Sequence, residues 1–179
     1  MNAGAHGSET ADAIHSARVF DIDTLDLEDR DADGFGFSYR RSNLTDRHFV
    51  VDATWALGKT EPAAVRSQME GYRKHRAETQ PGAVQNAGSV FKNPPGDSAG
   101  RLVESAGLKG LRVGGASVST LHANFFIAGE GSTAQDVFDL VHVVRAKVLD
   151  AFDVDLEPEI RFVGSYEEPR DRASVEVGP

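Results

Sequence analysis

Two kinds of hydrophobic pattern run along this chain, one with the two-residue period of a strand and one with the period of a helix. Residues 17–22 (ARVFDI) alternate in strand fashion, and residues 48–57 (HFVVDATWAL) have the β-branched and aromatic content of a second strand. Residues 123–128 (ANFFIA) and 157–163 (EPEIRFV) predict two more strands, of which the last closes the fold. The acidic stretch 21–33 predicts a solvated, turn-rich connection.

Helical spacing of apolar residues occurs in three stretches. Residues 61–80 predict a long helix, and residues 98–106 predict a short one that Ser98 caps and Gly107 closes. A third helix is expected over 132–150. Its buried positions are predicted to be Ala134, Val137, Phe138, Val141, Val144, Ala146 and Val148.

Composition and charge narrow the possible functions. The chain has 179 residues, of which 40% are hydrophobic and 26% charged, which is typical of a soluble globular protein. A net charge of −9 argues against nucleic-acid or anionic-membrane binding as the main role, because both require clustered positive potential. There is neither an apolar run of roughly 18 residues nor a signal-peptide layout, so a cytoplasmic location is expected.

The residue types present also limit the chemistry. Without cysteine there is no disulfide, thiolate nucleophile or cysteine metal site. The six histidines show no metal-ligand spacing, so no metal site is predicted. The chemistry must therefore rest on oxygen and nitrogen groups or on a cofactor.

The most informative polar run is NAGSVFKNP at residues 86–94. Ser89 can donate a hydrogen bond or a proton there, and Lys92 and Asn93 can hold an anionic or amide-bearing ligand beside it. The same residue types also favour ordinary turns. On its own, the run is thus consistent with either a turn or a site.

Three polar groups far apart in the sequence lie at predicted loop or strand ends: Arg40, Ser89 and Glu159. Protonation of a stabilised enolate requires such a set, with Arg40 on the substrate carboxylate, Ser89 delivering the proton and Glu159 stabilising the enol or relaying protons. Each group also has a structural alternative. Arg40 can cover the edge of a core with its stem, and Glu159 can pair with Arg161.

Six further runs extend across nearly the whole chain: MNAGAHG at 1–7, FSYRRS at 37–42, YRKHRAETQP at 72–81, AGSVFKNP at 87–94, AGRLVESAGLKGLRVGGASVSTLHANFFI at 99–127 and LEPEIRFVG at 156–164. In sequence and in order, these runs resemble the UDP-N-acetylenolpyruvoylglucosamine reductase family, also called UDP-N-acetylmuramate dehydrogenases. The resemblance implies a flavoenzyme of peptidoglycan synthesis. In such an enzyme NADPH reduces FAD, hydride passes to the enolpyruvyl double bond, and a serine protonates the neighbouring carbon.

Carried over by motif, the family's serine, glutamate and arginine are Ser89, Glu159 and Arg40. The resemblance implies a UDP-sugar substrate and adds further residues by position. Substrate contacts are expected at Tyr39, Asn93, Arg73, Arg76 and Lys92, and backbone approach to FAD at Asn2, Ala3, Gly4 and Ala5. The connection before Ser89 is similar to that of the smaller subclass, which lacks a tyrosine-bearing lid loop. The cluster that contains Arg73 and Arg76 also suits the C-terminal end of a helix, where the dipole favours positive charge.

The resemblance implies an α+β fold with three parts. Residues 1–58 are expected to be the remainder of an FAD-binding domain, 59–166 a substrate-binding domain and 167–179 a disordered tail. The family's glycine-rich loop for the flavin diphosphate lies before the first matched run, so an N-terminal flavin region is expected to be missing. A non-catalytic sugar-nucleotide-binding module is the alternative function.

Overall fold

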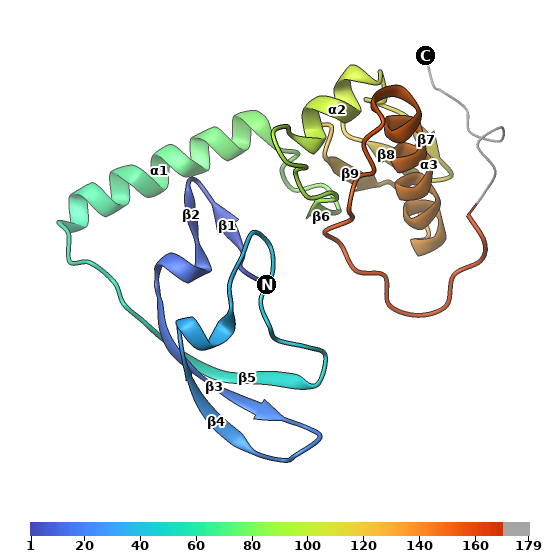
Figure 1. Cartoon of the computed structure of the whole chain (residues 1–179). Coiled ribbons are helices and arrows are strands. Elements are labelled where there is room, and N and C mark those ends of the chain that lie inside the picture. Colours follow the sequence, from blue (N-terminus) through green and yellow to red (C-terminus); the bar gives the residue numbers. More distant parts are fainter. Residues whose placement is uncertain (170–179) are drawn as a thin grey trace. The chain divides into compact units, whose positions relative to one another are not determined.

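The computed structural model describes residues 1–169 and confirms the α+β class. The chain divides into two compact units, Met1–Tyr72 and Arg73–Pro179, which are considered separately. The division falls inside helix α1 (Pro62–Thr79), whereas the sequence placed the domain boundary at 58/59 (Figure 1). Across the described residues, no helix is both long and apolar enough to span a bilayer.

The N-terminal unit contains a short hairpin and a three-stranded sheet. Strands β1 (Gly4–Ala5) and β2 (Ser8–Glu9) form the hairpin. The sheet has the order β4-β3-β5, with β3 (Ile14–Asp21) between β4 (Leu27–Asp31) and β5 (His48–Trp55), all antiparallel. Two 3₁₀ turns complete the unit, at Thr10–Asp12 and Asp33–Phe35. Its core consists of Ala17, Val19 and Phe35, with Ile14, Phe37, Leu44 and Ala53 packed against it.

Strand β4 corrects the sequence interpretation, which placed a solvated connection over residues 21–33. The chain turns after Asp21, whose carboxylate accepts the Asp23 N–H at 2.8 Å, and then returns as β4 beside β3. The acidic residues of β4 are compatible with a strand because β4 lies at the edge of the sheet and most of its side chains are exposed.

Strand β5 forms the other edge of this sheet and is unusually exposed for its composition. The side chains of Phe49, Val51 and Trp55 are 56%, 55% and 49% exposed, respectively. Val51 falls at a register shift and has no partner across in β3. Helix α1 likewise buries none of its residues.

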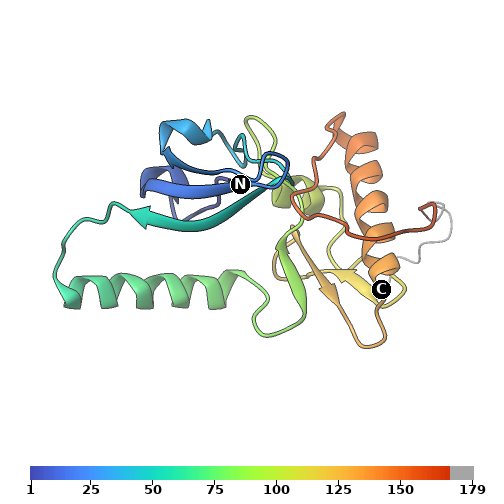
Figure 2. The ribbon, with the colours of Figure 1, turned by 90° about the horizontal axis from the view of Figure 1, so that it is seen from below.

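The C-terminal unit has a four-stranded antiparallel sheet in the order β6-β9-β8-β7. The strands are β6 (Asn86–Ser89), β7 (Arg112–Val113), β8 (Ala116–Val118) and β9 (Phe125–Ala128). Helix α3 (Ala134–Phe152) packs on β7 and β8 and also contacts α2 (Ala99–Ser105), as Figure 2 shows from below. The core comprises Val90, Phe91, Ala99, Leu102, Val103, Leu108, Leu111, Val113, Ala116, Val118, Ala123, Phe126, Leu140, Val141, Val143, Val144, Val148 and Leu156.

Both predicted helices of this unit are present. Ser98 caps α2 by accepting the Arg101 N–H, and Gly107 follows the helix with a φ of +72°, as the sequence predicts. Helix α3 starts two residues later than predicted, because Thr133 is the N-cap and forms a capping box with Asp136. The predicted buried set for α3 omitted Leu140 and Val143, which are both fully buried.

The C-terminal segment differs from the prediction over residues 157–163. Residues 157–163 form no strand; they make a single β-bridge, between Pro158 and Phe91. Of the predicted tail, residues 170–179 lie outside the described residues. The backbone N–H of Glu167 donates to Gln135 Oε1 at 3.0 Å, which holds this part of the segment against α3.

Candidate functional site

Ser89 is the last residue of β6, a strand where the sequence led us to expect a loop. The ladder between β6 and β9 pairs Asn86 with Ile127 and Ser89 with Phe125, with a register shift in between. At this bulge Gly88 has a φ of +79°, and its N–H donates to Asn86 Oδ1 at 3.0 Å. Bulges often redirect a side chain beside a functional site. The bulge therefore gives Ser89 an orientation that a regular strand would not.

The Ser89 side chain lies on the open face of the sheet. Phe126 and Val118 are a cross-strand pair buried in the core that the helices cover. Because side chains alternate between faces, the pair Ile127 and Ser117 lies on the opposite face. Ser89 pairs with Phe125, two residues from Ile127, and so shares that face. Within residues 1–169 the Ser89 hydroxyl makes no hydrogen bond and remains available to a ligand.

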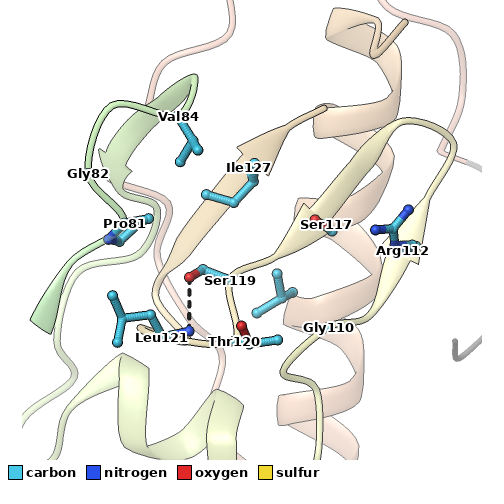
Figure 3. Close-up of a pocket in the computed structure, with 11 residues that line it drawn as sticks. Pro81, Gly82, Val84, Gly110, Arg112, Ser117, Ser119, Thr120, Leu121 and Ile127 are labelled. Carbon is cyan, nitrogen blue, oxygen red and sulfur yellow. Dashed lines mark hydrogen bonds between the residues drawn. The ribbon is translucent and has the colours of Figure 1, made fainter. Parts of the chain in front are cut away.

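A cavity of about 400 Å³ lies on the same open face (Figure 3). Its walls are largely apolar, and its polar groups include Arg112 and hydroxyls from β8 and the following turn. Ser119 Oγ accepts the Leu121 N–H at 3.1 Å, drawn as the dashed line, which fixes the turn at one end of the cavity. The lining residues are Pro81, Gly82, Val84, Gly110, Arg112, Ser117, Val118, Ser119, Thr120, Leu121 and Ile127.

Glu159 is brought next to Ser89 by backbone hydrogen bonds. The Glu159 N–H donates to the Val90 carbonyl at 2.7 Å, and the Lys92 N–H donates to the Glu157 carbonyl at 2.9 Å. The two extended segments therefore lie side by side, with Glu159 opposite the residue that follows Ser89. This pairing joins two of the three residues that the sequence assigned to proton transfer.

Asn124 holds this arrangement together and was not singled out from the sequence. Its side chain is 4% exposed; Oδ1 accepts the Phe91 N–H at 2.9 Å, and Nδ2 donates to the Phe91 carbonyl at 2.8 Å. The Val90 N–H donates to the Asn124 carbonyl at 2.9 Å. These bonds fix the backbone between Ser89 and Lys92. The available signal was an amide residue at the start of an otherwise apolar run.

The predicted substrate contacts Lys92 and Asn93 also have partners within the unit. Lys92 Nζ lies 2.6 Å from Glu157 Oε1, and Asn93 Oδ1 accepts the Ala99 N–H at 3.0 Å at the start of α2. Both side chains therefore stabilise the loop after Ser89. Arg73 and Arg76 are exposed on α1, and Arg76 Nε donates to Gln80 Oε1 at 3.1 Å.

Two titratable groups near this region have shifted pKa values. Burial lowers the pKa of His122, whose Nδ1 accepts the Asn124 N–H at 3.2 Å, so the neutral ring carries its proton on Nε2. Hydrogen bonds from the Arg101 side chain and then from the Ser98 N–H lower the pKa of Asp97 to about 2. Asp97 is thus an anion at neutral pH and supports the N-terminal end of α2.

The N-terminal unit has its own cavity, of about 510 Å³, lined by Gly4, Ala5, His6, Gly7, Ser8, Glu9 and Arg40. Arg40, with a φ of +54°, donates from Nη1 to Glu9 Oε1 at 3.1 Å and from Nη2 to the Gly4 carbonyl at 3.3 Å. A Cβ added at Gly4 would lie 2.8 Å from Arg40 Nη1. Glycine at this position therefore permits the close approach of Arg40 to the hairpin.

The predicted FAD segment lines this cavity only in part. Gly4 and Ala5 line it, whereas Asn2 is 2% exposed, and its side chain donates to Glu9 Oε2 at 2.6 Å and accepts the Ala11 N–H at 2.9 Å. Asn2 thus orders the hairpin and Glu9, a residue that the sequence reading missed. The exposed glycine backbone and the cationic Arg40 fit a portion of a flavin dinucleotide. Tyr39 is 46% exposed, with the Arg40 guanidinium 4.8 Å from its ring centre.

Arg40 and Tyr39 belong to the N-terminal unit, and Ser89 and Glu159 to the other. Within the C-terminal unit, Ser89 and Glu159 lie on neighbouring segments. Among residues 1–169, no group of three or more His, Cys, Asp or Glu side chains could hold a metal ion.

Comparisons with known proteins give one consistent result. Residues 80–163 match the family model described as UDP-N-acetylenolpyruvoylglucosamine reductase, C-terminal domain. A UDP-N-acetylenolpyruvoylglucosamine reductase of Bacillus velezensis is 40% identical over 168 residues, which are 92% of this chain and 54% of that relative. One from Bacillus licheniformis is 38% identical over 167 residues, covering 92% of this chain and 90% of the relative.

A solved structure agrees with these sequence relatives. The crystal structure of UDP-N-acetylenolpyruvylglucosamine reductase (MurB) from Thermus caldophilus superposes with a TM-score of 0.79 at 35% identity. The match covers 90% of this chain and 57% of that structure. The chain thus spans about half the length of most of the relatives it matches, including those of Bacillus velezensis and Nostoc punctiforme.

Proposed function

The chain belongs to the UDP-N-acetylenolpyruvoylglucosamine reductase family, and on that premise we propose that it supplies the substrate-binding and proton-donating part of such a reductase. The reaction would convert UDP-N-acetylglucosamine enolpyruvate to UDP-N-acetylmuramate, a precursor of peptidoglycan, in the cytoplasm. The observation that carries the proposal is the pairing of Glu159 with Val90, which puts a carboxyl group beside the strand that ends at Ser89.

Ser89 is the proton donor in this proposal. When FAD is bound, it would supply a hydride that originates from NADPH to one carbon of the enolpyruvyl double bond. The Ser89 Oγ–H would give its proton to the neighbouring carbon, so that two new C–H bonds replace the π bond. The resulting serine alkoxide must then recover a proton from solvent or through a relay. In the part of the chain that the structure describes, the Ser89 hydroxyl makes no hydrogen bond, so it is available for this task.

Glu159 and Arg40 would balance charge during that step. As hydride arrives, negative charge develops on the enol oxygen atoms of the substrate carboxyl group, and both residues are suited to that region. Glu159 would stabilise the enol form or relay the proton to Ser89. Arg40 would bind the substrate carboxylate bidentately, which requires it to share or replace its present contact with Glu9.

The remaining contacts are assigned by charge and position. Asn93 and Lys92 follow Ser89 directly and would contact the sugar nucleotide, while Arg73 and Arg76 would face its diphosphate. Tyr39 would lie along the substrate beside Arg40. Gly4 and Ala5 would approach the flavin through their backbone, together with Asn2 and Ala3 as ordering residues. The main cradle for the flavin diphosphate would come from the part of the family sequence that this chain does not span.

The decisive test uses this chain together with a complementary flavin-binding polypeptide from the Bacillus velezensis relative. We expect the pair to oxidise NADPH when UDP-N-acetylglucosamine enolpyruvate is present. The Ser89→Ala variant should leave reduction of FAD by NADPH unchanged but slow its reoxidation by the substrate by about 10²- to 10⁴-fold. Ser105→Ala, at an exposed serine of α2, is the matched control and should behave like the parent.

Two outcomes would separate this proposal from its alternative. Unchanged reoxidation in Ser89→Ala would remove Ser89 from the acid role. Tight binding of the UDP-sugar without NADPH oxidation, in a complex that contains FAD, would instead support a non-catalytic sugar-nucleotide-binding module.

A further inference from the structure

Three aromatic rings in the C-terminal unit join the end of the described chain to helix α3. The Tyr166 ring stacks on the Phe138 ring, with centres 4.7 Å apart and planes 17° apart. Phe162 meets both rings edge-on, at 5.0 Å from Phe138 and 5.4 Å from Tyr166. Gly164 bends the chain between the two segment rings with a φ of +113°, which a residue with a β-carbon rarely adopts. Phe138, Phe162 and Tyr166 thus all contact one another, and they are called the aromatic clasp below.

Gln135, also on α3, holds the backbone directly after the clasp. Its Oε1 accepts the Glu167 N–H at 3.0 Å, and its Nε2 donates to the Glu167 carbonyl at 3.4 Å. Gln135 and Phe138 are three positions apart and therefore lie on the same face of the helix. The end of the segment is thus fixed to α3 by stacked rings and by backbone hydrogen bonds together.

The beginning of the same segment carries Glu159. The Glu159 N–H donates to the Val90 carbonyl at 2.7 Å, next to the bridge between Pro158 and Phe91. From there to residue 167 the chain contains no helix or strand, so attachment at its two ends limits how it can move. Fixing both ends of such a segment reduces the number of conformations open to the residues in between.

We propose that the aromatic clasp positions Glu159 for its part in the reaction, with Tyr166 as a positioning residue. This rests on the proposed function for the role of Glu159. Without the Tyr166 ring, Phe138 loses its stacked partner and Phe162 loses one ring contact. The segment would then open more often, and the Glu159 carboxyl group would spend less time beside the strand that ends at Ser89.

Tyr166 would act through its ring, because its hydroxyl makes a long hydrogen bond, at 3.5 Å, to the Val163 carbonyl. Tyr166→Phe should therefore keep what Tyr166→Ala removes. The buried core of the unit contains neither Tyr166 nor Phe138. Truncation of the Tyr166 ring should thus leave the unit folded, which circular dichroism verifies.

The first test measures amide hydrogen exchange by NMR in this chain, without FAD or substrate. Tyr166→Ala should speed exchange of the Glu159 amide at least about tenfold, because this amide is protected by its hydrogen bond across to the neighbouring segment. Tyr166→Phe should change it less than about twofold. Val163→Ala, at an 88% exposed side chain of the same segment, is the matched control and should behave like Tyr166→Phe. The Val144 amide, inside α3, should exchange as in the parent in every variant.

The second test places these variants in the mixed reductase. Tyr166→Ala should slow reoxidation of FAD by the substrate about tenfold and leave reduction of FAD by NADPH unchanged, whereas Tyr166→Phe should match the parent. In a chain that already carries Glu159→Gln, Tyr166→Ala should add less than about twofold, because residues that act as one unit have non-additive effects.

Three results would overturn the proposal. They are unchanged exchange of the Glu159 amide in Tyr166→Ala, a faster exchange that the Val144 amide shares, and equal slowing by Tyr166→Ala with and without Glu159→Gln. Reoxidation in Glu159→Gln as fast as in the parent would instead count against the proposed function. In that case the exchange of the Glu159 amide still decides whether the clasp holds this residue in place.

Discussion

The two units differ in how completely they bury their own hydrophobic residues. The C-terminal unit surrounds a continuous core in which side chains from α2, α3 and all but the first strand of its sheet meet. The N-terminal unit buries only Ala17, Val19 and Phe35 and leaves a strand and a helix with apolar residues on the surface. Both contain similar apolar sequences, so composition alone does not cause the difference.

This contrast indicates which unit gains more from the burial of its own hydrophobic residues. Burial of apolar surface is the main driving force for folding, and a unit that exposes half of an apolar strand has forgone much of it. The C-terminal unit therefore has the properties of an independent domain. The N-terminal unit buries only a small core and leaves most of the apolar surface of β5 exposed.

The largest expected effect separates a leucine in the core of the C-terminal unit from a leucine at the sheet edge of the N-terminal unit. Leu140 on α3 is 0% exposed, so Leu140→Ala should lower the free energy of unfolding of the C-terminal unit by about 2–5 kcal/mol through lost transfer energy and a cavity. Leu27→Ala on β4 should change stability by no more than about 0.5 kcal/mol. Native-state hydrogen exchange resolved by peptide measures both, and similar losses at the two sites would abolish the distinction.

A smaller effect is expected from the hydrogen bonds that the Asn124 side chain makes to the Phe91 backbone inside the better-packed unit. Asn124→Ala removes two hydrogen bonds to Phe91 and leaves a buried N–H without a partner, so we expect a loss of about 2–3 kcal/mol. Asn86→Ala also removes local bonds to the backbone, but at a partly exposed site, and should cost about 1 kcal/mol or less. Denaturant unfolding followed by circular dichroism measures the loss in free energy of unfolding of each variant. Equal losses would show that the burial of the Asn124 hydrogen bonds adds nothing to stability.

The smallest expected effect is a dependence on pH. Burial lowers the pKa of His122 in the folded unit below its ordinary value of 6.5, so the unfolded chain binds this proton more readily. The contribution of neutral His122 to stability is therefore complete above about pH 6.5 and declines as the pH falls below it. His122→Gln should flatten the pH profile of unfolding below about pH 6.5. An unchanged slope in that variant would exclude His122 as its source.

Much of the fold follows from local signals in the sequence. The cap at Ser98, the glycine after α2 and the apolar periodicity of α3 each predict the element that is observed. Strand β4 was missed because its charged residues are typical of a loop, and only its pairing with β3 identifies it as a strand. The strand expected over 157–163 is reduced to one bridge, between Pro158 and Phe91, which the local residue pattern does not reveal.

The candidate site was predictable in its residue types but not in its geometry. Ser89 and Glu159 could be named from chemistry and resemblance, yet their proximity depends on a backbone hydrogen bond between segments about 70 positions apart. Asn124 and Glu9 act by holding other residues, and such roles become visible only when the partners are placed. Arg40 illustrates both points, because its charge was recognised while its present partner, Glu9, was not.

Trp55 gives the chain an intrinsic optical probe. It is the only tryptophan in the sequence, and it lies half exposed at the end of β5, whereas the aromatic residues of the C-terminal unit are phenylalanine and tyrosine. Excitation of the indole therefore reports on the N-terminal unit alone. Its emission would therefore follow the unfolding of this unit separately from that of the C-terminal unit, without any dye.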